Sequence, residues 1–566
     1  MWAAYALTGL RLPLAIVFWL TYGSPAWALI CVTAAAVSDA LDGRVARRAR
    51  RRAGIPEHAP AIGAWLDPAA DKLFVLIALA AIVAHDRDAW PLIACLAARE
   101  LVQAPLFVAY WIARRGRTIE LRAHAIGKVA TVVQFVAVAA IVAPVAGLRW
   151  PLAIAGGVLG LAAVVDQLRR ALRRPSAHRS SPSTASTPEL VHELAPHYPA
   201  LRAIRKRRTL EASPLWSEIG AEVERVLDGL ERVDRPGAVP PAGALRVVAW
   251  NVQRGTKLGA LREALTSDPE LSRADVLLLS EVDIGMGRSG NRNVPRELAD
   301  ALGASYAFAV SYLALEDDHL ENPDGLDSTL ALAGSAIVSR APILRAVSAD
   351  VPALRDKFES SEKRLGRKRA VVAELATASG PIVVAQAHLD SNASSEQRAQ
   401  QLAAILDAAD SLGATRLLLG GDLNTTTYNM ASPVQLAGDA LHKLFVTGFD
   451  GTIDNYMTPD RLYELPVFEL LAARGLVIEG FNDRAHGTLR YDFSEPYTIA
   501  KVRDAVGGAV TRWLTRRLRS RAGVIEARVD WFAGRGLVPV AASVPRPRPN
   551  GARASDHEPI VVDVAL

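Results

Sequence analysis

The stretch Ser38–Lys72 reads SDALDGRVARRARRRAGIPEHAPAIGAWLDPAADK and carries four aspartates between two apolar runs. Asp39 and Asp42 are three residues apart, and Asp67 and Asp71 are four residues apart. On helices, both spacings place the two carboxylates of a pair on one face. Two adjacent helices could therefore aim four oxygen ligands at one point, and this concentration of negative charge predicts bound cations.

The fixed positions of this stretch form one long pattern: Asp39-Ala-Leu-Asp42-Gly43-x-x-Ala46-Arg47, then Gly63-x-x-x-Asp67-x-x-x-Asp71. The pattern resembles the signature of the CDP-alcohol phosphatidyltransferases. The resemblance implies a reaction in which a CDP-linked lipid, usually CDP-diacylglycerol, donates its phosphatidyl group to an alcohol and CMP is released. The chain departs from the family in one respect: fifteen residues separate Arg47 from Gly63, and this spacing is longer than is usual in the family.

The same resemblance implies roles for the residues of the pattern. The four aspartates would hold two divalent ions, Mg²⁺ or Mn²⁺, and Asp71 would also deprotonate the acceptor hydroxyl. Gly43 would let the nucleotide approach the backbone, Ala46 would leave room beside it, and Arg47 and Gly63 would complete the substrate site. Such chemistry is reasonable in itself, because a hard cation bound by oxygen ligands neutralises a pyrophosphate and stabilises the leaving phosphate.

Composition divides the 566 residues into unlike parts. Half of the residues are hydrophobic, but the first third is far more apolar than the rest, so two or three domains are expected. The formal net charge is +6, yet the arginines cluster beside apolar runs, which favours membrane topology over nucleic-acid binding. Cys31 and Cys95 both lie inside apolar segments, which argues against a disulfide or a zinc site.

The first third predicts an all-α, polytopic membrane domain over residues 1–172. Six apolar stretches are mostly long enough to cross a bilayer, which takes roughly 20 residues per helix: 4–21, 25–40, 68–85, 90–112, 125–144 and 150–167. Positive residues concentrate in alternate connections, so both ends of this domain are expected in the cytoplasm. We therefore expect a multi-pass protein of the bacterial inner membrane, with its aspartate cluster at the cytoplasmic face.

Two further patches bear on the acceptor alcohol. The pair Arg99-Glu100 and the run Gly127-Lys128-x-x-Thr131-x-x-Gln134 look like features of the phosphatidylglycerophosphate synthase branch. Ionisable residues inside a membrane are costly and usually functional, although an Arg–Glu pair can also simply join two helices. Four cations could bind a phosphorylated acceptor such as glycerol 3-phosphate, or an inositol phosphate: Arg99, Arg115, Arg117 and Lys128.

Residues 173–244 read as a connection between two domains. The run SAHRSSPSTASTP that ends at Pro188 is small, polar and proline-containing, as in flexible tethers. Apolar residues then recur at helical spacing over 189–235. The basic run 202–208 could lie on anionic lipid or form a solvated helical face.

From residue 245 onward, short β-rich runs alternate with polar loops, and polar residues suited to metal and phosphate chemistry lie in or at the ends of these runs. In order they are LRVVAWN, ending at Asn251; DVLLLSE, ending at Glu281; PIVVAQAHLD, with His388; RLLLGGDLN, with Asp422 and Asn424; ARVDWF, with Asp530; and ASDHEPI, with Asp556 and His557. This succession resembles the endonuclease/exonuclease/phosphatase superfamily over residues 245–566. The resemblance implies an α/β two-sheet sandwich with its site where strand ends meet.

The resemblance assigns a role to each of these residues. Asn251 and Glu281 would hold Mg²⁺, with Asp556 as a further metal contact, so at least one ion is expected. Asp422 and Asn424 would orient the attacking water and the phosphate oxygens. His388 would hydrogen-bond a phosphate oxygen. His557, steadied by Asp530, would be the general base or a donor to the transition state, a role that suits an imidazole near neutral pH. Gln253 and Ala387 differ from residues that many members carry.

Residues 425–527 exceed what a compact nuclease needs. Within them, the segment 501–521 is basic and amphipathic and contains Trp513. A bilayer-facing helix would look like this, and so would a nucleic-acid surface.

Together the two halves predict a bifunctional enzyme. The membrane domain would make a phosphatidylglycerophosphate-type lipid, and the C-terminal domain would remove its terminal phosphate. Three alternatives remain open for the C-terminal domain: a phosphodiesterase acting on lipid headgroups, a membrane-anchored Mg²⁺-dependent nuclease, and a lipid-binding module without catalysis. Family resemblance also implies a homodimer through the membrane helices, whereas nucleic acid is not an expected partner.

Overall fold

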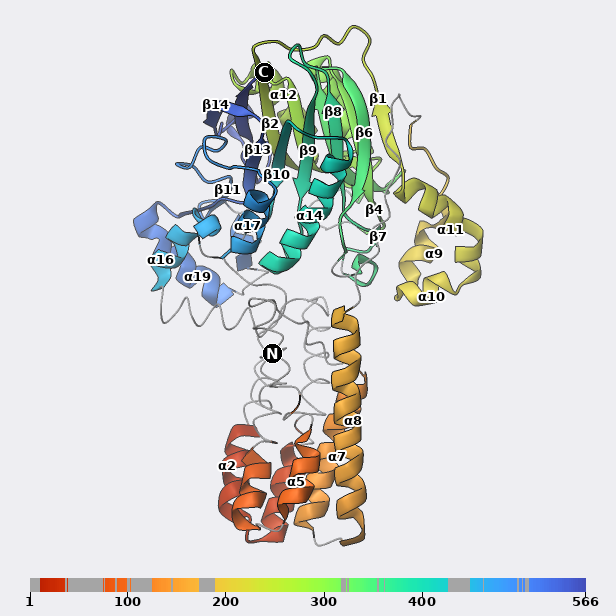
Figure 1. Cartoon of the computed structure of the whole chain (residues 1–566), viewed down its shortest axis with the longest axis vertical. Coiled ribbons are helices and arrows are strands. Elements are labelled where there is room, and N and C mark those ends of the chain that lie inside the picture. The colour runs from red at the N-terminus through yellow and green to blue at the C-terminus, as the bar shows by residue number, and fades with distance from the viewer. Residues whose placement is uncertain are drawn as a thin grey trace. The chain divides into compact units, whose positions relative to one another are not determined.

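The structure is a computed structural model, and its described residues form two compact units, one before residue 175 and one after residue 176 (Figure 1). The described residues are 11–35, 38, 75, 77–86, 89–98, 102, 125–143, 146–172, 189–316, 322, 325–353, 356–360, 362–425, 448–461, 463–495, 498–500, 502–503 and 508–566.

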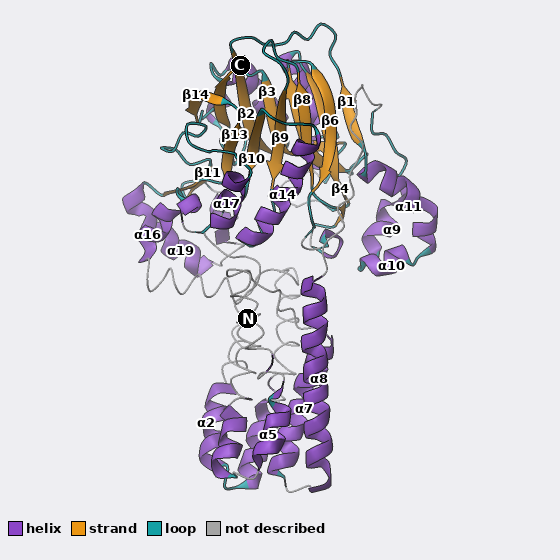
Figure 2. Cartoon of the chain, in the orientation of Figure 1, coloured by secondary structure: helices purple, strands orange, loops and turns teal. Residues whose placement is uncertain are grey.

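The described part of the N-terminal unit is helical (Figure 2). Its labelled helices are α2 (Arg11–Thr21), α5 (Trp90–Leu96), α7 (Ala125–Val142) and α8 (Ala146–Leu172). Residues 25–35 and 77–85 are helical as well. These helices pack around an apolar core that includes Phe18, Ile82, Leu96 and Phe135.

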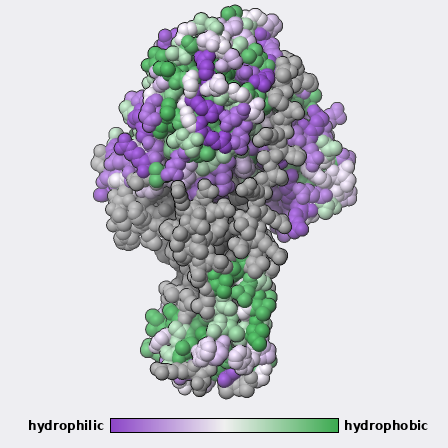
Figure 3. All heavy atoms as spheres, viewed as in Figure 1, coloured by the Kyte–Doolittle hydropathy of each residue, from purple (hydrophilic) through white to green (hydrophobic). Residues whose placement is uncertain are grey.

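The outer surface of these helices is also apolar. Leu20 is 77% exposed, Trp90 63% and Val158 60%, and Figure 3 shows hydrophobic side chains gathered on the surface of this unit. Exposed apolar area of this kind marks an interaction surface. Among the described residues, no helix combines the length and the apolarity that crossing a membrane requires. The expected six spans remain a prediction.

The C-terminal unit contains a mixed sheet of eight strands. In spatial order its strands are β1 (Leu230–Val233), β4 (Ser305–Ala314), β5 (Leu332–Ser339), β3 (Val276–Ile284), β2 (Ala244–Arg254), β15 (Ile560–Ala565) and β14 (Val538–Ser543), and β7 (Arg364–Gly366) pairs with β4. Along β2 and β3, which are parallel, most residues are buried, because both faces of the sheet are covered.

A second sheet of five strands stacks on the first. Its order is β13 (Asp530–Arg535), β10 (Leu417–Asp422), β9 (Ile382–His388), β8 (Arg369–Leu375) and β6 (Ile343–Asp350). The core between the two sheets includes Val247, Leu278, Val384, Leu418 and Phe532. The predicted two-sheet sandwich is therefore confirmed. A short ribbon of β11 (Leu489–Asp492) and β12 (Val524–Ala527) lies outside the two sheets.

Helices cover the outer faces of both sheets. The helices α12 (Leu258–Ser267) and α13 (Val294–Leu302) pack on the larger sheet, and α14 (Ser395–Ser411) and α17 (Leu465–Ala473) pack on the smaller one. The side chain of Ser394 accepts a hydrogen bond from the Gln397 backbone, and the Gln397 side chain accepts one from the Ser394 backbone, so α14 begins with a capping box.

Residues 189–233 are part of the C-terminal unit and pack on its larger sheet. They form α9 (Tyr198–Ala203), α10 (Arg207–Glu211), α11 (Pro214–Leu227) and β1, so the helical spacing in this segment corresponds to real helices. Leu201 and Val223 are fully buried in the core on the outer face of the larger sheet. Polar contacts add to this packing, because His192 Nε2 lies 2.7 Å from the carbonyl oxygen of Leu330.

Part of the 425–527 insertion forms a small subdomain of its own. Its helices α16 (Gly448–Asn455) and α19 (Gly508–Arg517) enclose a cluster that contains Ile453, Phe493 and Leu518. Trp513 of α19 is 53% exposed, and its ring centroid lies 5.3 Å from that of Phe449. The role expected for 501–521 remains a prediction.

Candidate functional site

Three residues of the site come from the smaller sheet, where register places them side by side. His388 ends β9 and Asp422 ends β10, and the two are paired across these parallel strands. Asp530 begins β13, which runs antiparallel to β10, and it is paired with Asp422 from the other side. One edge of the sheet therefore carries a histidine and two aspartates.

The larger sheet supplies the facing residues. Asn251 lies near the end of β2 and Glu281 near the end of β3, and His557 precedes β15, which pairs with β2. The pairing of β2 with β3 shifts register between Asn251 and Arg254. Such an irregularity bends a strand locally and redirects its side chains, as is common beside active sites.

Backbone strain is concentrated at this edge. Gln253, Arg254, Glu281 and Asn424 have positive φ angles of 48°, 64°, 54° and 48°, which residues other than glycine seldom adopt. Strain of this kind costs on the order of 1–3 kcal/mol per residue and persists where the surrounding structure imposes it. Its position points to this edge as the functional part of the domain.

His557 is held in a fixed orientation. Its Nδ1 lies 2.9 Å from Oδ2 of Asp530, and its Nε2 lies 4.0 Å from Oδ2 of Asp422. The indole Nε1 of Trp250 donates to the carbonyl oxygen of His557 at 3.0 Å and fixes the backbone there. The ring is 8% exposed, so Nε2 is the nitrogen left facing the site.

Asn251 and His388 complete the cluster. The amide Nδ2 of Asn251 donates to Oδ2 of Asp422 at 3.1 Å and to Oε1 of Glu281 at 3.4 Å. His388 Nε2 lies 3.8 Å from each of these two carboxylate oxygens. The structure thus brings together six predicted residues: Asn251, Glu281, His388, Asp422, Asp530 and His557.

The two remaining predicted residues lie beside this cluster. The backbone N–H of Asn424 donates to Oδ1 of Asp422 at 2.9 Å, and its side chain donates to the carbonyl oxygen of Leu389 at 3.0 Å. Ser555 Oγ, next to Asp556, donates to the carbonyl oxygen of Asn251 at 2.7 Å. In this arrangement the Asn424 side chain ties two strand ends together, and its expected contact with a phosphate remains a prediction.

The two histidines of the cluster have pKa values shifted in opposite directions. Burial opposes the charged form of His557, but the carboxylates of Asp530 and Asp422 outweigh it and raise the pKa of His557 to about 10. Burial and the positive charge of Lys368 lower the pKa of His388 to about 4. At neutral pH, His557 is therefore a cation and His388 is neutral.

The pKa values of two carboxylates in the cluster, Glu281 and Asp422, are also shifted in opposite directions. Burial opposes ionisation of Glu281, yet the positive charges of Arg254 and His557 lower its pKa. Burial and the neighbouring Asp530 raise the pKa of Asp422. A buried carboxylate with a raised pKa holds a proton more readily, so Asp422 is the better base of the two.

The donor set of the cluster fits a divalent cation. Ligand atoms of Asp422, Asp530 and His557 all lie within 4.8 Å of one another, but the cationic His557 has no free ring lone pair, so the carboxylate oxygens would be the ligands. Oδ1 of Asp530 is buried and accepts no hydrogen bond from the residues that the structure describes. Hard oxygen donors with unbalanced negative charge are what Mg²⁺ or Mn²⁺ requires. Binding by the predicted set of Asn251, Glu281 and Asp556 remains a prediction.

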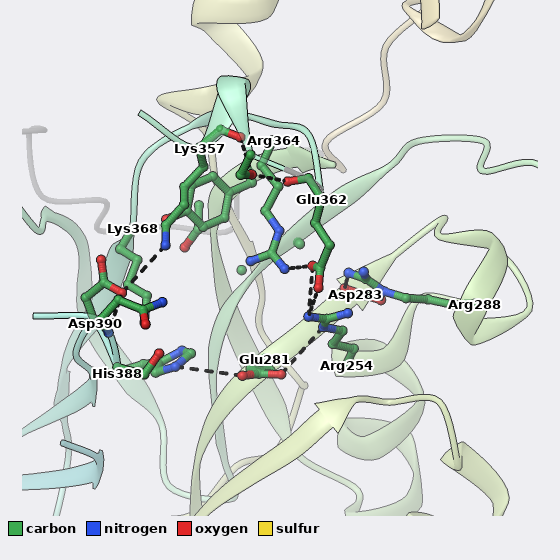
Figure 4. Close-up of a pocket in the computed structure, with 17 residues that line it drawn as sticks. Arg254, Glu281, Asp283, Arg288, Lys357, Glu362, Arg364, Lys368, His388 and Asp390 are labelled. Atoms are coloured by element: carbon green, nitrogen blue, oxygen red, sulfur yellow. Dashed lines mark hydrogen bonds and ion pairs between the residues drawn. The ribbon is translucent and has the colours of Figure 1, made fainter. Parts of the chain in front are cut away.

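A pocket of about 360 Å³ opens beside the cluster, and Glu281 and His388 form part of its wall (Figure 4). Five cations line this pocket and were not among the residues predicted from the sequence: Arg254, Arg288, Lys357, Arg364 and Lys368. The run KRLGRKR at 363–369 could have indicated Arg364 and Lys368, because a dense basic segment between two β-rich runs can face a binding site as well as solvent.

The transferase residues named above lie outside the described residues: Asp39, Asp42, Gly43, Ala46, Arg47, Gly63, Asp67, Asp71, Arg99, Arg115 and Arg117. The backbone of Lys128 belongs to α7, near its start. The roles assigned to these residues remain predictions.

Comparison with known families identifies both halves of the chain. Residues 1–165 match the family model for CDP-alcohol phosphatidyltransferase, and residues 248–557 match the model for the endonuclease/exonuclease/phosphatase family. Both resemblances seen in the sequence are therefore confirmed.

Curated relatives match the N-terminal part. A CDP-diacylglycerol–glycerol-3-phosphate 3-phosphatidyltransferase of Salmonella choleraesuis (strain SC-B67) is 34% identical over 134 residues, which are 22% of this chain and 66% of that protein. Its counterpart from Escherichia coli (strain K12) is 36% identical over 118 residues, 20% of this chain and 60% of that protein. The chain thus spans 60 to 66% of the length of these relatives.

Solved structures match the C-terminal part. An endonuclease/exonuclease/phosphatase family protein from Leptotrichia buccalis C-1013-b has 13% sequence identity and a TM-score of 0.33, and the match covers 57% of this chain and 100% of that one. A TM-score of this size supports no inference about activity.

Proposed function

We propose, from the premise that the chain belongs to the endonuclease/exonuclease/phosphatase family, that its C-terminal domain is a metal-dependent phosphoesterase. The observation that carries this proposal is the cationic His557, fixed by Asp530 and facing Asp422 at the edge of a pocket rich in arginine and lysine. Phosphate-ester hydrolysis requires a positively charged site that holds the anion and positions a proton acceptor.

The N-terminal domain is proposed to make the lipid on which this hydrolase acts. Residues 1–165 match the transferase family, and the relatives' names specify CDP-diacylglycerol and glycerol 3-phosphate. The exposed apolar helices suit a lipid environment, which supports a bacterial inner-membrane protein with its C-terminal domain in the cytoplasm. The transferase would use two Mg²⁺ or Mn²⁺ ions, and it would form a homodimer through its helices.

The two reactions fit one another chemically. Transfer of a phosphatidyl group to glycerol 3-phosphate leaves a lipid with a terminal phosphomonoester. Hydrolysis of that ester yields a neutral glycerol end and inorganic phosphate. The joint enzyme would therefore make phosphatidylglycerol from CDP-diacylglycerol in two steps.

Each residue of the hydrolase cluster has a part in this step. Water attacks phosphorus as the ester P–O bond breaks, and Asp422 accepts the proton of the water because its pKa is raised. That proton passes to the departing alkoxide. His557, as a cation, stabilises charge on the phosphoryl oxygens, and neutral His388 donates a hydrogen bond to one of them. Asp530 holds the His557 ring in position.

Glu281, Asn251 and Asp556 would hold the metal ion, and Asp422 lies within reach of it. When bound, a divalent cation neutralises phosphoryl charge and lowers the barrier to attack. Asn251 donates its amide N–H to Asp422, and its Oδ1 accepts from the backbone N–H of Gln253 at 3.1 Å, which leaves one lone pair of this oxygen for the ion.

The test follows both reactions in one incubation of the full-length protein with CDP-diacylglycerol and Mg²⁺. Acceptors are glycerol 3-phosphate, inositol phosphate and unphosphorylated alcohols, and the products measured are CMP, lipids and free phosphate. We expect the wild-type chain to yield phosphatidylglycerol and phosphate with glycerol 3-phosphate. His557→Ala should lose at least about 100-fold in phosphate release and accumulate the phosphorylated lipid, because the loss of one group that stabilises charge in the transition state costs on the order of 100- to 1,000-fold. Asp71→Asn should abolish CMP release.

His486→Ala serves as the matched control, since this exposed histidine pairs with Asp483 away from the cluster. Unchanged lipid products in His557→Ala would reject the coupled reaction. Release of a whole phosphorylated headgroup would instead identify a phosphodiesterase, and strand scission of plasmid DNA would identify a nuclease.

A further inference from the structure

We infer that the pocket beside the catalytic cluster binds a second phosphate group of the same substrate, so that the C-terminal domain selects phosphomonoesters that carry another phosphate a few bonds away. This inference rests on the proposed function, because it assigns the substrate class of the same site.

The pocket continues directly from the catalytic cluster. Oε1 of Glu281 lies 3.8 Å from Nε2 of His388, and Oε2 of Glu281 lies 3.6 Å from Nε of Arg254. One carboxylate therefore separates the residue that faces the scissile phosphate from the first cation of the pocket. A substrate held by His388 can reach Arg254 within the length of a small polyol.

Beyond Arg254, the cations share few negative partners. Glu362 accepts a hydrogen bond from Arg254 at 3.0 Å and is also paired with Arg364, so two guanidinium groups share one carboxylate. Lys357 lies 3.6 Å from Asp390. The half-buried ammonium of Lys368 donates to the carbonyl oxygen of Leu389 at 2.6 Å, and this oxygen carries no full negative charge.

The overall balance of the pocket is positive. Its lining contains five cationic and four carboxylate side chains. One pair is already complete, because Arg288 binds Asp283 through two hydrogen bonds of 2.7 and 3.0 Å and both side chains are buried. The other four cations face three carboxylates, one of which is Glu281 of the catalytic cluster. Figure 4 shows these side chains converging on the same space.

A phosphate group matches this arrangement better than a carboxylate. A phosphomonoester carries up to two charges and three free oxygens, and a phosphodiester carries one charge and two free oxygens. In either form these oxygens can receive several hydrogen bonds at once from the cations of the pocket, Arg254, Arg364, Lys357 and Lys368. Arg364 is positioned for this role, since its guanidinium carbon lies 5.7 Å from the centroid of the Tyr312 ring. A cavity of about 360 Å³ accommodates a phosphate and a short polyol.

The substrate class is therefore a bisphosphate, whether a soluble polyol or a lipid headgroup. Phosphatidylglycerophosphate belongs to this class, because a glycerol separates its terminal phosphomonoester from a phosphodiester. Its terminal phosphate would face His557, and its diester phosphate would occupy the pocket.

The experiment measures kcat/KM of the full-length protein for glycerol 1,3-bisphosphate and for glycerol 1-phosphate, which differ by one phosphate. Wild type should prefer the bisphosphate. Arg364→Gln and Lys357→Met should each lower the ratio of the two values about 10- to 100-fold, as expected when a hydrogen bond to a charged group is removed. Arg225→Gln, an exposed arginine paired with Glu222, should leave the ratio unchanged. A lipid arm compares phosphatidylglycerophosphate with phosphatidic acid in detergent micelles, and a preference confined to the soluble arm would assign the pocket to free bisphosphates.

A binding arm separates failure of this inference from failure of the proposed function. Calorimetry on the His557→Ala chain should show glycerol 1,3-bisphosphate binding at least ten times more tightly than glycerol 1-phosphate. Equal affinities there, or equal effects of Arg364→Gln and Lys357→Met on both substrates, would overturn the second phosphate site. Absence of hydrolysis together with selective bisphosphate binding would reject the phosphoesterase and keep the site.

Discussion

Lys368 links the charge of the pocket to pH. Burial lowers its pKa to about 8, although Asp390, Asp422 and Glu281 favour its charged form and Lys357 opposes it. The ammonium is protonated below this value and neutral above it, so affinity for an anion falls as pH rises through about 8. Phosphate monoesters are already fully ionised in this range, because their second pKa is on the order of 6. The substrate itself therefore adds no pH dependence.

We expect the dissociation constant for glycerol 1,3-bisphosphate to rise between pH 7.5 and pH 9.5 in titrations of the full-length His557→Ala chain. Lys368→Arg provides the control, because a guanidinium remains charged throughout this range and should flatten the curve. A wild-type-like rise in Lys368→Arg would show that another group titrates.

At the scale of residues, the sequence allowed us to predict which side chains the fold brings together where a polar residue lies at the end of a buried β-rich run, and the roles of these residues stay predictions. Asn251, Glu281, His388 and Asp422 each follow such a run, and strand ends meet at one edge of a sandwich. Prediction failed for Arg254 and Arg364, because what joins them is a shared contact with Glu362, which lies 108 residues from Arg254 in the chain. Sequence spacing does not contain that information.

Among the elements, α14 offers the clearest test of how the site is supported. Its capping box at Ser394 satisfies two backbone donors that the first turn of a helix leaves open. Ser394→Ala should lower the free energy of unfolding by about 1 kcal/mol, as measured by urea denaturation of the full-length protein. Ser217→Ala is a matched control, since Ser217 is exposed within α11. A loss no larger than that of Ser217→Ala would show that the cap contributes nothing.

Elements were predicted more readily than their pairing. The β-rich runs of the sequence indicated five strands, β2, β3, β9, β10 and β13, and helical spacing over 189–235 matched α9, α10 and α11. The register shift beside Asn251 had no signal in the sequence, because it depends on how β2 meets β3. Likewise, the burial of Leu201 and Val223 on the larger sheet depends on a partner surface that only the folded chain provides.

For the whole molecule, the order of motifs was more informative than any one of them. A single Asp-His pair is common, whereas six β-rich runs that carry eight such residues in a fixed order indicated the C-terminal family before its fold was known. The helical character of the N-terminal unit followed from its apolar composition. The acceptor alcohol did not follow in the same way, since glycerol 3-phosphate and an inositol phosphate both carry a phosphate that the same predicted cations could bind.

Coupling between the halves is the last property that the whole chain allows us to predict. The run SAHRSSPSTASTP before Glu189 has the composition of a flexible tether, which raises the local concentration of one domain around another toward millimolar values. A protease site inserted after Ser186 makes this testable. In dilute detergent micelles with CDP-diacylglycerol and glycerol 3-phosphate, the uncut protein should release phosphate almost as fast as CMP. Cleavage should leave CMP release unchanged and slow phosphate release at least ten-fold, because the hydrolase must then find its lipid by diffusion. Equal rates before and after cleavage would mean that contacts other than the tether hold the two domains together.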